Sequence, residues 1–439
     1  MLEPCDLLIE AGHVVPVVPH AVVLPDHAVA VTAGRIMAVL PIAEARARFR
    51  PAAVISRPQH ALLPGLVNLH CHAAMTVMRG LADDLPLMRW LQEHIWPTEA
   101  AFVGPELVQD GITLAAAEML RGGVTTVNDM YFFPDVAAQA FARAGMRATI
   151  GLIVIEFPSA WAQSPAEYFD KGLSVYGECK DLPGIRFAFA PHAPYTVSDE
   201  SFERIRVLSD QLDLPVHVHV HETAFEVDDA VRQRNERPLA RLKRLGLVNS
   251  NLIAVHMTQL SDAEIQLVGE QGVSIAHCPE SNLKLASGFA PIERLRRAGA
   301  NVAIGTDGCA SNNDLDLLGE IRTAALLAKA VAQDAAAIDA AYALQMATLN
   351  GARALGLDAE IGSIEVGKSA DLITVDLSRF DVLPVYSAIS QLVYASNRRD
   401  VCDVWVMGEP RVQDGALCHF DPNALAELAR RWGQRIAAR

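Results

Sequence analysis

Eight strongly apolar runs recur along the middle of the chain, each followed by an amphipathic stretch rich in alanine and leucine. The runs are 61–69, 123–130, 147–155, 185–191, 214–220, 251–256, 272–277 and 301–306. Short apolar runs indicate buried strands, and strands that alternate with helices predict a parallel sheet. Eight such units predict an α/β fold, a (β/α)8 TIM barrel, which we expect over residues 61–361.

The two ends of the chain have a different pattern. Residues 1–60 contain short alternating or β-branched segments with Gly and Pro turns between them, and the same texture returns at 362–377 and 400–415. Such segments predict short strands. We therefore expect both ends to meet in one small discontinuous β-sandwich domain, composed of residues 1–60 and 362–439.

Several of the eight runs end in a polar residue that can do chemistry. These residues are His70, Asp129, His192, His221, His256, His277 and Asp307. A (β/α)8 barrel places its catalytic groups at the carboxyl ends of its strands, so the pattern favours an enzyme.

Histidine motifs in two of these runs indicate a metal site. His70 and His72 are two residues apart in VNLHCH, so on a strand both imidazoles point to one face. Three alternate histidines in LPVHVHVHET (214–223) also share a face, and their spacing does not show which of them binds metal. Together with the carboxylate of Asp307, such nitrogen ligands suit Zn²⁺ that keeps an open position for water.

Composition narrows the class of protein further. Apolar residues make up 51% of the chain, which supports a large core, and 37 basic against 52 acidic residues argue against nucleic-acid binding. A nucleoside carries no phosphate and is still a suitable ligand. Seven scattered cysteines without a CxxC pair fit neither a disulfide framework nor a cysteine zinc site. No signal-like or membrane-length apolar segment occurs, so we expect a cytoplasmic protein that contacts no membrane. We also expect it to be a homo-oligomer.

Six segments of the chain together resemble the amidohydrolase superfamily. They are PGLVNLHCHAAM, APHAPYT, HVHVHET, AVHMTQL, HCPESNLKLASG and GTDGCASNN. More narrowly, they are similar to the cytosine-deaminase/chlorohydrolase branch and to its 5′-methylthioadenosine/S-adenosylhomocysteine deaminases. The resemblance covers nearly the whole chain, and it includes GSIEVGKSADLITVD (362–376) in the small β-domain.

The resemblance implies roles for particular residues. The ligands of one Zn²⁺ per chain are then His70, His72, His219 and Asp307. Glu222, three residues after His219, is implied to be the proton shuttle, and His256 is implied to hold the attacking water together with Asp307. The fourth run lacks the lysine that bridges two metals in related hydrolases, so a single metal is expected.

The same resemblance implies how a substrate is held. Glu99 would bind the ribose 2′- and 3′-hydroxyls, Trp90 would form a wall of the pocket, and His192 would contact the nucleoside. Ser311 lies within reach of the purine in this interpretation. Relatives that recognise homocysteine have arginines after the third strand, whereas IGLIVIEFPSAW (150–161) has none. This difference favours a short apolar 5′ substituent.

We therefore predict a zinc-dependent hydrolytic deaminase of adenine nucleosides. It prefers 5′-methylthioadenosine, which it converts to 5′-methylthioinosine and ammonia, with S-adenosylhomocysteine or adenosine as secondary substrates. One alternative is a deaminase or chlorohydrolase of a free heterocycle such as guanine or a triazine. Another is a non-catalytic binding protein on the same fold. Glu99 distinguishes the nucleoside deaminase from the enzyme of a free heterocycle, because only a nucleoside offers ribose hydroxyls to its carboxylate.

Overall fold

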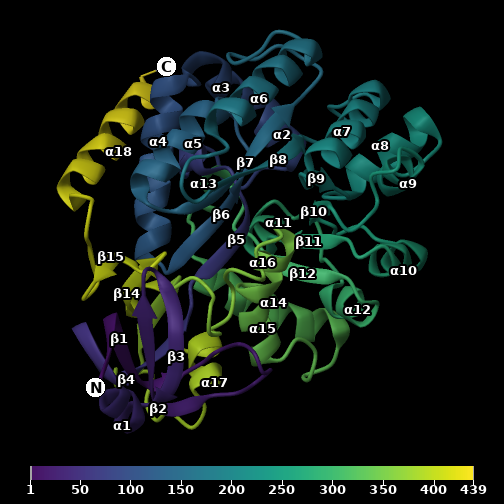
Figure 1. The fold of residues 1–439 in the computed structure, drawn as a ribbon. Helices are drawn as coiled ribbons and strands as arrows, with labels where there is room; N and C mark the ends of the chain where they lie inside the picture. Colours follow the sequence, from purple (N-terminus) through teal and green to yellow (C-terminus); the bar gives the residue numbers. More distant parts are fainter. Residues whose placement is uncertain (1, 439) are drawn as a thin grey trace.

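The computed structural model describes residues 2–438, which form two eight-stranded sheets with helices around them (Figure 1). One sheet is parallel throughout and confirms the predicted barrel architecture. Its strands in spatial order are β5 (Leu66–Cys71), β6 (Val124–Asp129), β7 (Arg147–Val154), β8 (Ile185–Pro191), β9 (Val216–Val220), β10 (Leu252–His256), β11 (Ser274–His277) and β12 (Asn301–Ile304). Each predicted run contributes one of these strands.

The last strand of the barrel meets the first at their carboxyl ends. The His70 carbonyl accepts hydrogen bonds from the backbone N–H of Thr306 (3.1 Å) and of Asp307 (3.0 Å). A Cβ on Gly305 would lie only 2.8 Å from the His70 Cβ, so a glycine is required for this approach. The contact brings the two chain segments with the predicted metal ligands side by side.

Helices follow the strands and cover the barrel. The longer ones are α4 (Pro105–Arg121), α5 (Pro134–Ala144), α6 (Pro165–Cys179), α7 (Asp199–Leu212), α8 (Ala224–Arg234), α10 (Asp262–Glu270) and α14 (Leu317–Ala332). The shorter ones are α2 (Leu87–Trp90), α3 (Trp96–Phe102), α9 (Pro238–Arg244), α11 (Pro279–Lys284), α12 (Ile292–Arg297), α13 (Cys309–Asn312), α15 (Ala340–Met346), α16 (Leu349–Ala354) and α17 (Ala388–Tyr394). Helix α1 (Ile42–Arg48) packs on the other sheet instead. Ser or Thr side chains cap the first turns of α6, α7, α8 and α10.

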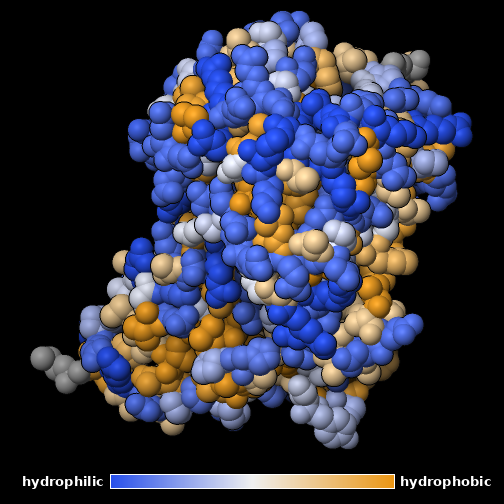
Figure 2. All heavy atoms as spheres, turned by 90° about the vertical axis from the view of Figure 1, so that its right-hand side faces the viewer, coloured by the Kyte–Doolittle hydropathy of each residue, from blue (hydrophilic) through white to orange (hydrophobic). Residues whose placement is uncertain are grey.

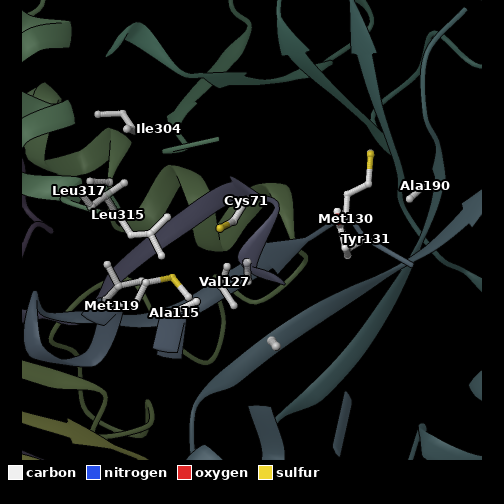
Figure 3. Close-up of a cluster of buried hydrophobic side chains, with 14 of the residues drawn as sticks. Cys71, Ala115, Met119, Val127, Met130, Tyr131, Ala190, Ile304, Leu315 and Leu317 are labelled. Carbon is white, nitrogen blue, oxygen red and sulfur yellow. The ribbon is translucent and has the colours of Figure 1, made fainter. Parts of the chain in front are cut away.

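A large apolar core joins most of the strands to these helices. Figure 3 shows part of it, including Ala115 and Met119 of α4, Val127 of β6 and Cys71 at the end of β5. All four side chains are fully buried. The core therefore extends up to the strand ends and supports the residues that follow them.

The second sheet is built from both ends of the chain. Its order is β16 (Ala416–Leu417), β15 (Glu409–Gln413), β14 (Val401–Val406), β13 (Leu372–Asp376), β4 (Phe49–Pro64), β1 (Glu3–Val14), β2 (Leu24–Thr32) and β3 (Arg35–Pro41). It is mixed, because β1 and β4 are parallel while the other pairs are antiparallel. The chain ends thus meet in one sheet, as the sequence pattern predicts.

The first predicted run is divided between the two sheets. Residues 61–64 belong to β4 and pair with β13, and the chain enters the barrel after Gly65. A Cβ on Gly65 would lie 2.2 Å from the Thr125 hydroxyl oxygen, so only glycine fits at this crossing. A continuous apolar run gives no sign of the change of sheet, because both sheets bury it.

The last helix, α18 (Pro422–Ala437), runs beside α4 of the barrel, although its position in the sequence groups it with the small sheet (Figure 1). Its Trp432 is 1% exposed, and the indole N–H donates to the Asp110 carboxylate at 2.8 Å. Arg435 adds an ion pair to Glu106 at 3.0 Å.

The surface combines charged and apolar areas. Figure 2 shows hydrophilic residues over much of the upper part of one face, and hydrophobic residues gathered on its lower part, at the height of the small sheet. Over residues 2–438, no helix has both the length and the hydrophobicity that crossing a membrane requires.

Candidate active site

A cavity opens at the carboxyl ends of the barrel strands. Nine of the ten predicted site residues line it: His72, Trp90, Glu99, His192, His219, Glu222, His256, Asp307 and Ser311. The tenth, His70, is fully buried, and its Nε2 lies 3.3 Å from Oδ1 of Asp307. The fold therefore brings all ten predicted residues together.

Four of these side chains direct their donor atoms toward one point. Nε2 of His72 lies 3.3 Å from Oδ1 of Asp307, and Nε2 of His219 lies 3.3 Å from Nε2 of His70. The ligand atoms of the three histidines all lie within 4.8 Å of one another. Three nitrogens and a carboxylate oxygen at such separations fit a zinc ion.

Hydrogen bonds fix the orientation of the imidazoles. Nδ1 of His72 donates to the Met130 carbonyl and Nδ1 of His219 to the His192 carbonyl, both at 2.6 Å. A carbonyl only accepts, so the proton of each ring is on Nδ1 and the Nε2 lone pair is free for a metal. These bonds support the cluster as a metal site, because they prepare the ligand atoms before an ion binds.

Asp307 is held by several donors. Its Oδ2 accepts from the hydroxyls of Ser281 (2.6 Å) and Ser311 (2.8 Å), and its Oδ1 accepts from the Gly308 N–H (2.8 Å). Burial alone would raise the pKa of this carboxyl, but hydrogen bonding to His70 and the nearby histidine charges hold the pKa well below its ordinary value. Ser311 thus both lines the cavity and donates a hydrogen bond that orients the Asp307 carboxylate.

The backbone at two strand ends is in an unusual conformation. His256 has φ 72° and Asp307 has φ 60°, in the left-handed region that most side chains avoid. Non-glycine residues persist there where the surroundings fix them, and such residues cluster at functional sites. Nδ1 of His256 lies 2.8 Å from the Asn282 amide oxygen, which leaves Nε2 facing the cavity.

Glu222 is anchored mainly through its backbone, and its carboxyl accepts one long hydrogen bond from the Ser287 hydroxyl (3.4 Å). Its N–H donates to Glu226 (2.7 Å) and its carbonyl accepts from the Thr258 hydroxyl (2.7 Å). Its carboxyl oxygen lies 3.8 Å from Nε2 of His256. Burial, with a contribution from the charge of Asp307, raises the pKa of Glu222 to about 8. The raised pKa favours the protonated form of this carboxyl at neutral pH, and in that form it can donate a proton.

Glu99 and Trp90 come from the segment between β5 and α4, where α2 and α3 flank a π-helical turn at Leu91–Ile95. The Glu99 carboxylate accepts from the Tyr131 hydroxyl at 2.8 Å, and burial raises its pKa to about 7. The indole N–H of Trp90 is buried and has no partner among residues 2–438. His192, whose Nδ1 lies 3.0 Å from the Thr196 hydroxyl, completes the polar lining near His219.

Sequence reasoning missed several residues that support the site. Tyr131 follows the end of β6 by two positions, so its place beyond a strand end was a usable signal. Glu226 lies three residues after the N-cap Thr223, in the pattern of a capping box, and that spacing was also visible. Thr258 lies two positions beyond the end of β10 and had the same signal as Tyr131. Ser281 has no such signal, because only the folded chain brings it to Asp307.

Comparison with known proteins agrees with this geometry. Residues 61–411 match the amidohydrolase family. The chain is 46% identical over 434 residues to a 5-methylthioadenosine/S-adenosylhomocysteine deaminase of Teredinibacter turnerae, covering 99% of this chain and 98% of the relative. The chain therefore belongs to the amidohydrolase family.

Solved structures show the same fold. A crystal structure of an adenosine deaminase from Xanthomonas campestris with bound zinc is 62% identical, covers 100% of both chains and has a TM-score of 0.99. An atrazine chlorohydrolase from Arthrobacter aurescens with zinc is 24% identical, with a TM-score of 0.88 over 97% of this chain and 99% of that one. The second likeness shows a shared fold alone.

Proposed function

We propose that this protein is a zinc-dependent deaminase of adenine nucleosides that prefers 5′-methylthioadenosine, with S-adenosylhomocysteine and adenosine as secondary substrates. The observation that carries the proposal is one cavity that combines a histidine–aspartate cluster, the buried carboxyl of Glu222 and a separate carboxylate, Glu99. The relatives named for deamination of such nucleosides support it.

In this proposal His70, His72, His219 and Asp307 would hold one zinc ion per chain. When bound, the ion would lower the pKa of a nearby water toward neutrality. The chain's own contribution is to orient the ligand atoms through the carbonyls of Met130 and His192.

Proton transfers then fall to three residues. Asp307, with His256 beside it, accepts a proton from the water whose oxygen bonds to C6 of the adenine ring. Glu222 donates its proton to ring N1 as that bond forms. The resulting carboxylate takes up the remaining hydroxyl proton, Asp307 returns its proton to the amine, and ammonia leaves. Both carboxyl groups regain their starting states, and the product is an inosine-type nucleoside.

Glu99 gives the proposal its nucleoside specificity. An ionised carboxylate accepts hydrogen bonds from two neighbouring hydroxyls at once, which matches the ribose 2′ and 3′ positions. The Tyr131 hydroxyl fixes one carboxylate oxygen, so the group is oriented before substrate binds. A free heterocycle has no hydroxyls for Glu99, and this supports the nucleoside over the guanine or triazine alternative.

The preference for a short 5′ group follows from the apolar lining. Ile155 and Phe157, which follow β7, line the cavity together with Trp96. Glu156 points elsewhere, because its carboxylate accepts from the Ser201 hydroxyl (2.7 Å) and the Ser198 N–H (3.0 Å) at the start of α7. Among the described residues no lysine or arginine lines this cavity. A methylthio group fits such a wall better than the charged tail of S-adenosylhomocysteine.

An ultraviolet assay of deamination tests the proposal. The zinc-loaded protein is offered adenosine, 5′-methylthioadenosine, S-adenosylhomocysteine, guanine and cytosine at equal concentrations. We expect the highest kcat/KM for 5′-methylthioadenosine and no turnover of the free bases. Turnover of guanine without turnover of any nucleoside would favour the free-heterocycle alternative, and no turnover at all would favour a binding protein. The cytoplasmic location and the homo-oligomer stay predictions. Light scattering would measure the oligomeric state.

A further inference from the structure

The three histidines of the proposed zinc site are oriented by different kinds of partner. Nδ1 of His72 and of His219 bonds to a backbone carbonyl, whereas Nδ1 of His70 lies 2.9 Å from Nε2 of His217. His217 is on β9, two residues before His219, and is fully buried. His70 is therefore the one of these three ligands whose orientation depends on another side chain.

The positions of the protons follow from this contact. If Nε2 of His70 binds a metal, the proton of that ring is on Nδ1, and the hydrogen bond runs from His70 to Nε2 of His217. The proton of His217 is then on its own Nδ1. That atom is buried and has no hydrogen-bond partner among residues 2–438. An unpaired buried N–H is unfavourable, so the Nδ1–H of His217 lowers the stability of the core. The Nε2 of the same ring accepts the hydrogen bond from His70.

We propose that His217 is a positioning residue for the zinc site. It accepts the hydrogen bond of His70 Nδ1–H, holds the His70 ring at its angle, and keeps Nε2 of His70 as the ligand atom. Partners of this kind strengthen metal binding because they fix both the tautomer and the direction of the ligand. His217 is not itself a ligand, since its Nε2 is occupied by the bond to His70. The inference rests on the ligand set proposed above.

Zinc affinity of the purified apo-protein, measured by competition with a chromophoric chelator, tests this role. His217→Met removes the acceptor and keeps a similar volume, and we expect it to bind zinc about 10–100-fold more weakly. His217→Gln places an amide oxygen near the position of Nε2, so its affinity should return to within a few-fold of the native value. Excess zinc should restore most of kcat in both variants, which general damage to the fold would not allow.

His277 of β11 provides a matched control. Its imidazole is also buried with an unpartnered Nδ1, and it belongs neither to the ligand set nor to the cavity lining. His277→Met should keep native zinc affinity. An equal loss in His277→Met would show an effect of any core histidine and would overturn the proposal. The proposal also fails if His217→Met binds zinc within twofold of the native protein, or if His217→Gln is as weak as His217→Met.

A second test uses the native protein and therefore does not depend on whether a variant folds. In the zinc-loaded protein with ¹⁵N-labelled histidine, two-bond correlations distinguish the two neutral forms of each ring. We expect His217 to carry its proton on Nδ1, and a proton on its Nε2 would overturn the proposal. A failure of the ligand assignment is recognised separately, because His70→Ala would then retain native zinc affinity whatever His217 does.

Discussion

The two halves of the cavity are built differently. On the metal side, the ligand atoms extend from strand ends, and each Nδ1 of the three histidines and both oxygens of Asp307 have hydrogen-bond partners. On the nucleoside side, Glu99 and Trp90 come from short helical turns over residues 87–102, with one hydrogen bond to Glu99 and none to the Trp90 indole in the part of the chain described. We call these the rigid half and the looser half. In the function proposed above, the rigid half would carry the chemistry and the looser half would set specificity.

Removal of the metal is expected to have the largest effect. Dialysis against a chelator should abolish deamination, and one equivalent of zinc per chain should restore it. His219→Ala should lose both zinc and activity, because it removes a nitrogen from the rigid half. Elemental analysis is the measurement, and two metals per chain or full zinc content in His219→Ala would contradict the ligand assignment.

Glu222→Gln separates catalysis from binding within the rigid half. It keeps the size of the side chain and removes its titratable proton, so kcat should fall by about 10²–10⁴. Zinc content and product affinity should stay near native, because the carboxyl is not assigned as a ligand. Steady-state kinetics, metal analysis and calorimetry with product check these three outcomes. Loss of zinc would instead make Glu222 a ligand.

The 5′ side of the looser half is tested by comparing two substrates. We expect kcat/KM for 5′-methylthioadenosine to exceed that for S-adenosylhomocysteine by about one to two decades, since an unpaired carboxylate costs roughly 1–3 kcal/mol. Phe157→Arg adds a cation to the apolar wall and should narrow this ratio. Equal efficiencies in the native protein would mean that a cationic group reaches the 5′ side from elsewhere.

Glu99→Gln should mainly weaken nucleoside binding. An amide accepts one hydroxyl where a carboxylate accepts two, so KM should rise by about tenfold, or roughly 1.4 kcal/mol, with a smaller change in kcat. Discrimination between ribo- and 2′-deoxyribonucleosides should fall as well, and parallel kinetics with both substrates measures it. An unchanged ribose preference would move the free-heterocycle alternative ahead.

The smallest expected effect is on the pH dependence of KM. Burial raises the pKa of Glu99 to about 7, so the carboxyl is ionised above that pH and neutral below it. Because the ionised form accepts both hydroxyls, KM should rise several-fold as the pH is lowered from 8 to 6. Glu99→Gln should show no such rise. A substrate that lacks both hydroxyls should also show none, since it has nothing to offer Glu99.

Much of the rigid half was predictable from the sequence, for a physical reason. Strands bury long apolar runs and barrels collect groups at strand ends, so VNLHCH and LPVHVHVHET indicate both the elements and the site. The resemblance to a known family then selected His219 from its neighbours. Alternation could not, because His217 points to the same face and differs in what it meets across the barrel, Nδ1 of His70.

The remaining features depend on contacts between distant segments. Tyr131 reaches Glu99 and Thr258 reaches Glu222 only in the folded chain, and no periodicity marks such a pair. The split of the first run at Gly65 and the place of α18 against α4 have the same origin. Sequence patterns describe what each segment buries, and they do not describe which other segment it is buried against.

The paired ends of the small sheet have a consequence for biosynthesis. Strand β4 needs β13 to complete its ladder at residues 60–64, yet about 300 residues of barrel separate the two strands along the chain. At roughly 5–20 residues per second, a ribosome makes that stretch in about 15–60 s. Throughout this interval the edge of β4 is unpaired on the nascent chain, while the barrel is being synthesised beside it. We therefore expect the nascent chain to expose this strand edge until Leu372–Asp376 has emerged from the ribosome.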